Sequence, residues 1–364
     1  EISLGLVGSE MCIRDSRHAD LMGGGEEYRD SLNQPIHLAT VREMISAYQD
    51  VGVTAHGYAA VYAVGHEEWP RWQHLSLQDA DSQPYALADF LNVIDCGDPE
   101  WLEHFARDLR AATTAVGFAG FHLDQYGYPK VARRSDGALV DVGKAFECLV
   151  REVRRYLPEV SLIFNNVNEF PAWRSRDWPQ SAVYIEPWEP NTTWAALAQM
   201  ISRARAGADR LPVCLAAYQS VYSHAPAENA DWATQFTMAT CFSHGATQLL
   251  AGESGHLLVD PYYVSNHAAA ESTLGVLTAW YDFAAEWDDL LFDRSDHEVT
   301  ASMAGAYNDD IDVSFEGVSL SAIARAGLLW RRVVETDHGL LIHLINLVEQ
   351  PDDEWDSPKV APPD

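Results

Sequence analysis

The chain has 364 residues, 47% of them hydrophobic, so it can bury one large core or two smaller ones. Its 54 Asp and Glu residues outnumber 24 Lys and Arg, which gives a formal net charge of −30. Such an acidic surface repels phosphate backbones, so no nucleic-acid partner is expected. No apolar run reaches the roughly 18 residues of a membrane-spanning helix, so no membrane partner is expected either. Composition leaves the oligomeric state open.

The cysteines do not predict a metal site. Their positions contain no CxxC pair and no metal-ligand spacing: Cys12, Cys96, Cys148, Cys214 and Cys241. Cys148 and Cys214 lie in apolar runs and are expected to be buried thiols. We therefore expect no metal and no other cofactor.

The first sixteen residues, EISLGLVGSEMCIRDS, lack an initiator methionine and differ in character from the rest of the chain. We interpret residues 1–16 as a non-native scar of cloning or assembly and exclude them from the fold prediction. The chain is accordingly expected to be a fragment of a longer protein.

From residue 40 onwards, segments with helical periodicity alternate with short apolar runs. The helical segments are 40–52, 99–117, 142–157, 192–207, 229–245 and 273–291. The seven predicted strands are 53–63, 90–96, 120–127, 160–167, 182–188, 212–218 and 246–253. This alternation predicts a parallel sheet, either an open doubly wound sheet or a (β/α)8 barrel.

Polar residues at the ends of these strands favour the barrel, because a barrel collects site residues from every strand while an open sheet uses one switch point. They are Asp95, Asp124, Asn165, Asn166, Glu186, Tyr218 and Glu253. No Gly-rich nucleotide-binding motif follows any strand. We predict an α/β fold with a TIM-type barrel over residues 17–295 that lacks one strand. The apolar run at 339–348 predicts that residues 296–364 begin a C-terminal β domain, which is truncated.

Two of the strand-end carboxylates could act as a pair. Glycosidic bond cleavage commonly uses two carboxyl groups, and Asp124 and Glu186 end two different predicted strands. Strand alternation places His122 on the face of Asp124, and Trp188 on the face of Glu186. A single strand-end aspartate is more often a helix or turn cap, and the segment EPWEP could be a surface loop. On this pattern alone, other hydrolases and barrel lyases also remain open.

The segments around both carboxylates resemble glycoside hydrolase family 66, the dextranases and cycloisomaltooligosaccharide glucanotransferases. Similar segments follow in the same order from about Arg17 to Trp355: NVIDCGDPEW, GFHLDQYG, IFNNVNEF, VYIEPW, LAAYQS, GATQLLAGE, WYDFAAEWDDLLFD and HLINLVEQPDDEW. In the family, a strand precedes the pair that Arg17 and His18 resemble. The resemblance therefore implies that the missing strand is the first one, displaced by residues 1–16.

The resemblance implies a retaining mechanism with Asp124 as nucleophile and Glu186 as acid/base. It also implies an α-glucan partner. The candidates for substrate contacts are His122, Gln125, Tyr126, Asn165, Asn166, Trp188, Tyr218 and Glu253, each with an alternative role in ordinary packing or strand-end hydrogen bonding. The segment LLAGES departs from the family's HIELGD, and LAAYQS from its AAYMNY, so the exact glucan is open.

The leading functional prediction is endo-dextranase-type hydrolysis of α-1,6-glucan. Cyclising members carry a carbohydrate-binding module late in the barrel, and residues 221–245 are too few to form one. A transglucosylase that forms cyclic or other α-1,6-glucans is the alternative, and an inactive glucan-binding fragment is a further one. A polymeric substrate suggests an extracellular location.

Overall fold

The computed structural model describes residues 26–29, 35–66, 68–87, 91–252, 255–261, 267–304, 311 and 313–363. Residues 1–16, the Arg17–His18 pair and Glu253 lie outside this range. The chain forms two compact units, Glu1–Tyr184 and Ile185–Asp364. The division falls within strand β12 (Ala182–Glu186). The predicted domain boundary at residue 295 stays a prediction.

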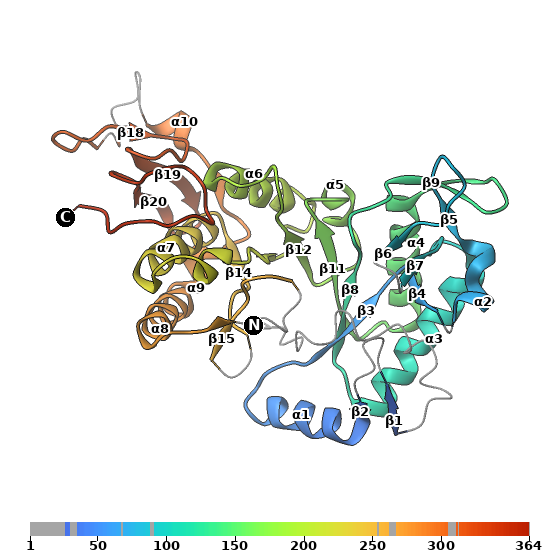
Figure 1. The fold of residues 1–364 in the computed structure, drawn as a ribbon. Coiled ribbons are helices and arrows are strands. Elements are labelled where there is room, and N and C mark those ends of the chain that lie inside the picture. The colour runs from blue at the N-terminus through green and yellow to red at the C-terminus, as the bar shows by residue number, and fades with distance from the viewer. Residues whose placement is uncertain are drawn as a thin grey trace. The chain divides into compact units, whose positions relative to one another are not determined.

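The first unit is built on neighbouring parallel strands, β3 (His56–Ala60), β8 (Gly120–Asp124) and β11 (Ser161–Val167), followed by the start of β12 (Figure 1). The register pairs Tyr58 of β3 with His122 of β8. Gly120 is required in the central strand, because a Cβ there would lie 2.4 Å from the Ser161 carbonyl oxygen of β11. The parallel register brings the carboxyl ends of these strands to one edge.

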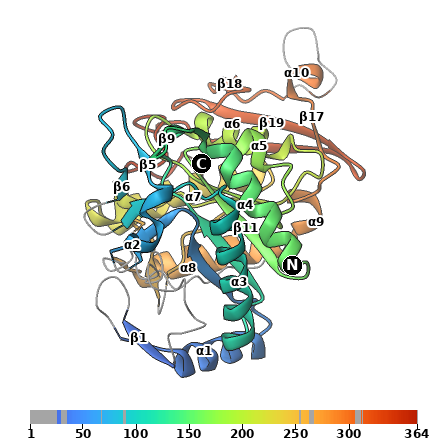
Figure 2. The same cartoon turned by 90° about the vertical axis from the view of Figure 1, so that its right-hand side faces the viewer.

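Two long helices, α3 (Pro99–Val116) and α4 (Val142–Tyr156), lie beside each other against this sheet (Figure 2). Asp98 caps α3 by accepting a hydrogen bond from the Glu100 amide at 2.9 Å, and Asp141 caps α4 in the same way. The core between helices and strands is made of apolar side chains from both, including Leu109, Phe121, Leu123, Phe146, Leu149, Leu162 and Phe164. Phe121 and Leu123 therefore point to the helices, and His122 and Asp124 to the opposite face.

The predicted strand at 90–96 is real but does not belong to the parallel sheet, so this part of the prediction was wrong. Strand β7 (Leu91–Val93) pairs antiparallel with β4 (Ala63–Gly65) and β6 (Ala86–Leu87). The Ile94 amide donates to the Tyr62 carbonyl at 2.9 Å, which continues the contact to the chain leaving β3. A short apolar run before a helix is thus insufficient to predict its partner strand.

Helix α1 and several short elements complete the first unit. They are β1 (Glu27–Arg29), β2 (Pro35–His37), α1 (Leu38–Asp50), α2 (Trp69–Trp72), η3 (Gln73–Leu75), β5 (Leu77–Gln78), β9 (Val131–Arg134), β10 (Leu139–Asp141) and α5 (Ala172–Ser175). The Cys148 side chain in α4 is exposed, contrary to the expectation of a buried thiol, because it shares a helix face with the exposed Lys144 and Arg151.

The second unit continues the alternation with the end of β12, β13 (Val213–Leu215) and β14 (Ala246–Gln248) as parallel neighbours. The Ala216 amide donates to the Ile185 carbonyl at 2.9 Å. The helices are α6 (Trp194–Arg205), α7 (Ala227–Ser243) and α8 (Glu271–Glu286), with the short elements η4 (Ser220–Ser223), α9 (Asp288–Leu291), β15 (His256–Leu257) and β16 (His267–Ala268). None of the described helices of the chain is long and apolar enough to cross a membrane.

A separate sheet follows residue 296. Its centre is β19 (Leu329–Thr336), which pairs antiparallel with β17 (His297–Glu298) and β20 (Gly339–Asn346) and parallel with β18 (Leu320–Ser321). The short helix α10 (Thr300–Met303) precedes β18. A β-rich segment thus occupies the region where a C-terminal β domain was predicted to begin.

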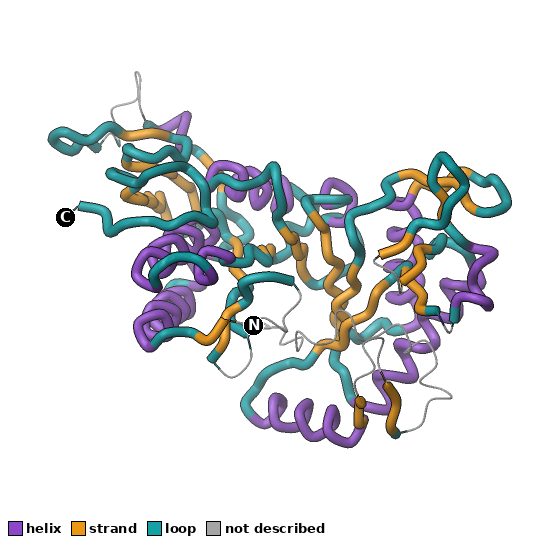
Figure 3. The backbone as a smooth tube through the Cα atoms, in the orientation of Figure 1, coloured by secondary structure: helices purple, strands orange, loops and turns teal. Residues whose placement is uncertain are grey.

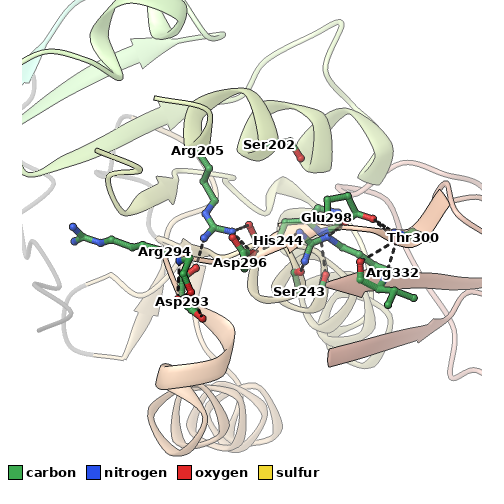
Figure 4. A network of polar contacts seen from close by, with 12 residues as sticks. Ser202, Arg205, Ser243, His244, Asp293, Arg294, Asp296, Glu298, Thr300 and Arg332 are labelled. Atoms are coloured by element: carbon green, nitrogen blue, oxygen red, sulfur yellow. Dashed lines mark hydrogen bonds and ion pairs between the residues drawn. The ribbon is translucent and has the colours of Figure 1, made fainter. Parts of the chain in front are cut away.

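A buried ionic network ties this sheet to the helices of the same unit (Figure 4). The Asp296 carboxylate accepts from Arg205 of α6 at 2.7 Å and from Arg210 at 2.8 Å. Arg332 of β19 lies near the same carboxylate and pairs with Glu298 at 2.6 Å. Asp296 and Arg205 are each 7% exposed by side chain, so their ion pair is shielded from water, whereas Glu298 is half exposed.

The alternation of strands and helices along the chain (Figure 3) confirms an α/β fold with parallel strands. A closed (β/α)8 barrel is not confirmed. Among the described residues, β3 has only β8 as a parallel neighbour and β14 has only β13. A barrel would require a further strand to join these two edges.

Candidate active site

Asp124 is held at the carboxyl end of β8 by hydrogen bonds to both of its carboxylate oxygens. The Tyr58 hydroxyl donates to Oδ2 at 2.5 Å, and the Asn165 amide nitrogen donates to Oδ1 at 2.6 Å. The donors come from β3 and β11, the two strands that flank β8. Donors on both sides restrict rotation of the carboxylate, while its own exposure is intermediate. This arrangement is typical of a carboxylate that must be aimed rather than of a helix cap.

His122 lies two residues before Asp124 on the same face. Its ring stacks on Tyr58 at 6.0 Å and meets the edge of Tyr184 at 4.7 Å between ring centroids. Burial lowers the pKa of His122, an effect that the Asp124 charge partly opposes. His122 is therefore neutral near pH 7, and it supports the ring that positions Asp124.

Two of the predicted substrate contacts point away from this face. The Gln125 amide donates to the carbonyls of Asn165 and Phe170 at 3.1 and 3.0 Å, and the side chain is 1% exposed. Asn166 is fully buried: its amide nitrogen donates to the Tyr184 carbonyl at 2.8 Å, and its oxygen accepts from the Ser175 hydroxyl. Both geometries favour a structural role over substrate contact, whereas Asn165 faces Asp124.

The loop after Asp124 is fixed by a tyrosine that the sequence did not single out. The Tyr62 hydroxyl accepts from the Tyr126 amide at 3.0 Å and donates to the Tyr128 carbonyl at 2.6 Å. Burial raises the pKa of Tyr62 well above its usual range, so the hydroxyl keeps its proton. The Tyr126 ring packs against Tyr62 at 5.5 Å and is half-buried. Its contact with substrate stays a prediction.

Tyr58 was also missed. The signal was present in HGYAA, where residue 58 alternates into one face of a strand, but the register against β8 is visible only in the structure.

The second unit places Glu186 at the end of β12, with 8% of its surface exposed. Trp188 follows in the loop and is 40% exposed, while Tyr218 after β13 is buried. The rings of Trp188 and Tyr218 lie 6.1 Å apart with a tilt of 47°. We name these two residues the aromatic pair. Aromatic faces beside a carboxylate suit the apolar faces of a sugar ring.

Among the described residues, no group of three His, Cys, Asp or Glu side chains could hold a metal ion. The arrangement offers instead carboxylates at the ends of parallel strands, flanked by tyrosine, histidine, asparagine and tryptophan. Such groups can attack carbon, transfer protons and bind hydroxyls.

Comparisons with known proteins agree with this chemistry. The model of Glycosyl hydrolase family 66 matches residues 18–364. A cycloisomaltooligosaccharide glucanotransferase from Niallia circulans is 24% identical over 256 residues, covering 64% of this chain and 25% of that protein. The chain thus spans about a quarter of the length of this curated relative.

Solved structures show the likeness in fold. The cycloisomaltooligosaccharide glucanotransferase of Paenibacillus sp., complexed with cycloisomaltoheptaose, superposes with a TM-score of 0.83 at 15% identity, covering 93% of this chain and 68% of that one. The α-amylase of Geobacillus thermoleovorans, complexed with acarbose, gives a TM-score of 0.54 at 10% identity, covering 86% of this chain and 70% of that one.

Proposed function

Because the chain belongs to glycosyl hydrolase family 66, we propose that it carries the catalytic residues of a glycosidase or transglucosylase that acts on α-1,6-linked glucans. The observation that carries the proposal is the Asp124 carboxylate, held on both oxygens by donors from the flanking strands. A cap or a loop carboxylate needs only one such partner.

In the proposed mechanism, an Asp124 oxygen attacks the anomeric carbon while the bond to the leaving oxygen breaks. Glu186 gives its proton to that oxygen, and a glucosyl ester of Asp124 forms. Glu186 then takes a proton from water or from an acceptor sugar, whose oxygen displaces Asp124. Two displacements restore the original anomeric configuration.

The pairing of these two carboxylates rests on the family to which the chain belongs, and each of them ends a strand. The Tyr184 ring contacts His122, two residues before Asp124 on β8. Glu186 lies two residues after Tyr184 on β12. Side chains two apart on a strand point to the same face, so Asp124 shares a face of β8 with His122, and Glu186 shares a face of β12 with Tyr184. A closed barrel would gather them at its axis, and the barrel remains part of this proposal.

Hydrolysis and glucosyl transfer share the same first step and differ in the acceptor. The short connection at 221–245, which leaves no room for an inserted module, supports endo-dextranase-type hydrolysis. The names of the relatives support transfer to an acceptor sugar at least as well. Chromatography of the products from dextran separates these outcomes, since hydrolysis gives linear isomaltooligosaccharides and intramolecular transfer gives cyclic ones. We keep an extracellular location as a proposal that follows from the size of dextran.

The assignment is tested by Asp124→Asn and Glu186→Gln, with Glu159→Gln as a control. Glu159 is an exposed carboxylate that precedes β11, at the amino end of the strands. We expect kcat to fall by about 10²–10⁴-fold in Glu186→Gln and by at least as much in Asp124→Asn, with the control unchanged. Proton NMR of the first product should show the α-anomer. Wild-type activity in either variant would refute the roles, and glucan binding without turnover by the wild type would favour the glucan-binding fragment.

A further inference from the structure

The segment that follows β20 contacts the loops that carry the aromatic pair. We call residues 352–359 the C-terminal strap. The strap, red in Figure 1, passes beside the yellow helix α7. The Lys359 amide donates to the Asn229 carbonyl of α7 at 3.1 Å. The Lys359 side chain is fully buried, pairs with Asp352 at 2.5 Å and lies 4.8 Å above the Trp194 ring. The Lys359 ammonium also donates to the Ser357 hydroxyl at 2.6 Å, and removing its carboxylate partner would leave a buried charge unpaired.

Trp355 of the strap binds the loop that leaves β12. Its indole nitrogen donates to the Asn191 carbonyl at 2.9 Å, and its amide donates to the Thr192 carbonyl at 2.9 Å. The Asn191 amide in turn donates to the Trp188 carbonyl at 2.8 Å, closing a turn. Trp355 is 6% exposed, so these bonds are shielded from water. Trp355 therefore contacts the turn that Trp188 begins.

The next residue, Asp356, binds the loop that leaves β13. Its carboxylate accepts from the Val221 amide at 2.9 Å and from the Ser220 hydroxyl at 2.5 Å. Ser220 lies two residues after Tyr218, and the intervening Gln219 is fully buried. Two consecutive strap residues thus hold the loops behind both members of the aromatic pair.

We infer that Trp355 and Asp356 are positioning residues that set the separation and tilt of Trp188 and Tyr218 and thereby the affinity for glucan. The inference rests on the proposed function, since it assigns sugar binding to the aromatic pair. Neither strap residue takes part in the bond-breaking step, so their loss affects KM more than kcat.

The test compares Asp356→Ala, Asp356→Asn and Trp355→Phe with Glu354→Gln. Glu354 is an exposed carboxylate in the same strap, so its variant removes one charge without disturbing either loop. With dextran as substrate, we expect Asp356→Ala and Trp355→Phe to raise KM by roughly five- to twentyfold and to change kcat by less than about threefold. Asp356→Asn keeps one acceptor oxygen and should recover part of the affinity, and Glu354→Gln should match the wild type.

Hydrogen exchange of the Val221, Asn191 and Trp194 amides provides a second readout that does not depend on activity. We expect faster exchange in Asp356→Ala and Trp355→Phe on protein that otherwise unfolds like the wild type. Equal KM values in all variants, or losses of kcat and KM that merely follow the folded fraction, would overturn the inference. A wild-type protein inactive on dextran would instead count against the proposed function, while the exchange data would still decide whether the strap orders the loops.

Discussion

Removing the Tyr58 hydroxyl tests the role of the carboxylate more gently than removing Asp124 itself. In Tyr58→Phe the ring that stacks on His122 remains, and the 2.5 Å hydrogen bond to Oδ2 of Asp124 is lost. A hydrogen bond to a charged group contributes about 1.5–3 kcal/mol. Each 1.36 kcal/mol corresponds to about a tenfold change in rate, so kcat/KM should fall by roughly 10- to 100-fold if orientation of Asp124 limits the attack.

The matched control is Tyr62→Phe. It also removes a buried tyrosine hydroxyl, but one that bonds the Tyr126 amide and the Tyr128 carbonyl rather than Asp124. The assay is initial-rate kinetics on an α-1,6-glucan, with urea unfolding of each variant to correct for folded protein. We expect Tyr62→Phe to lose stability and to keep more activity per folded molecule than Tyr58→Phe. A Tyr58→Phe enzyme with wild-type kcat/KM would refute the argument that Asp124 must be aimed by its neighbours.

Three further predictions concern stability and are measured by urea unfolding. Asn166→Ala should lower the free energy of unfolding by about 1–3 kcal/mol, because it leaves the Ser175 hydroxyl and the Tyr184 carbonyl without their hydrogen-bond partner. An altered KM at full stability would contradict the structural role of Asn166. Asp296→Asn should lower the free energy of unfolding by about 3–5 kcal/mol, since it leaves the buried Arg205 guanidinium without its carboxylate. A loss below about 1 kcal/mol would show that the network contributes little. The free energy of unfolding should also fall between pH 7 and pH 5, because burial lowers the pKa of His343 to about 4. Below pH 6.5 the unfolded chain binds a proton at this histidine that the folded chain does not. This difference lowers the free energy of unfolding by about 2 kcal/mol at pH 5. A flat profile over this range would contradict it.

The alternation of helices and parallel strands could be predicted from the sequence because it depends on local periodicity. Six of the seven predicted strands lie in the parallel arrangement, and the seventh, at 90–96, pairs antiparallel. Its partner β4 is a three-residue strand directly after β3. Pairing partners are a tertiary property, and an apolar run of this length carries no information about them. Closure of a barrel is equally non-local, which is why the strand pattern alone could not establish it.

The same distinction between local pattern and tertiary contact applies to the residues of the candidate site. The positions of Asp124 and Glu186 at strand ends could be predicted from the periodicity of the sequence, and their catalytic roles stay a prediction. Strand alternation could also have separated Asn165 from Asn166, since neighbours on a strand face opposite sides. Tyr58 could not be predicted as a partner of Asp124, because the hydrogen bond depends on β3 and β8 being neighbours in one register. The ion pairs of Asp296 could not be predicted for the same reason, because its partners lie up to 91 positions away in the sequence.

These observations share a physical pattern. The residues proposed for chemistry and sugar binding lie at strand ends and in loops, where the backbone alone does not fix a side chain. Each is held by polar groups that are distant in the sequence: Asp124 by Tyr58 and Asn165, and the loop of Trp188 by Trp355. Because these bonds are at least partly buried, losing one leaves a polar partner unsatisfied and removes a restraint on the residue or loop that it held. Residues that never contact substrate should therefore control affinity here, and the strap variants measure that control directly.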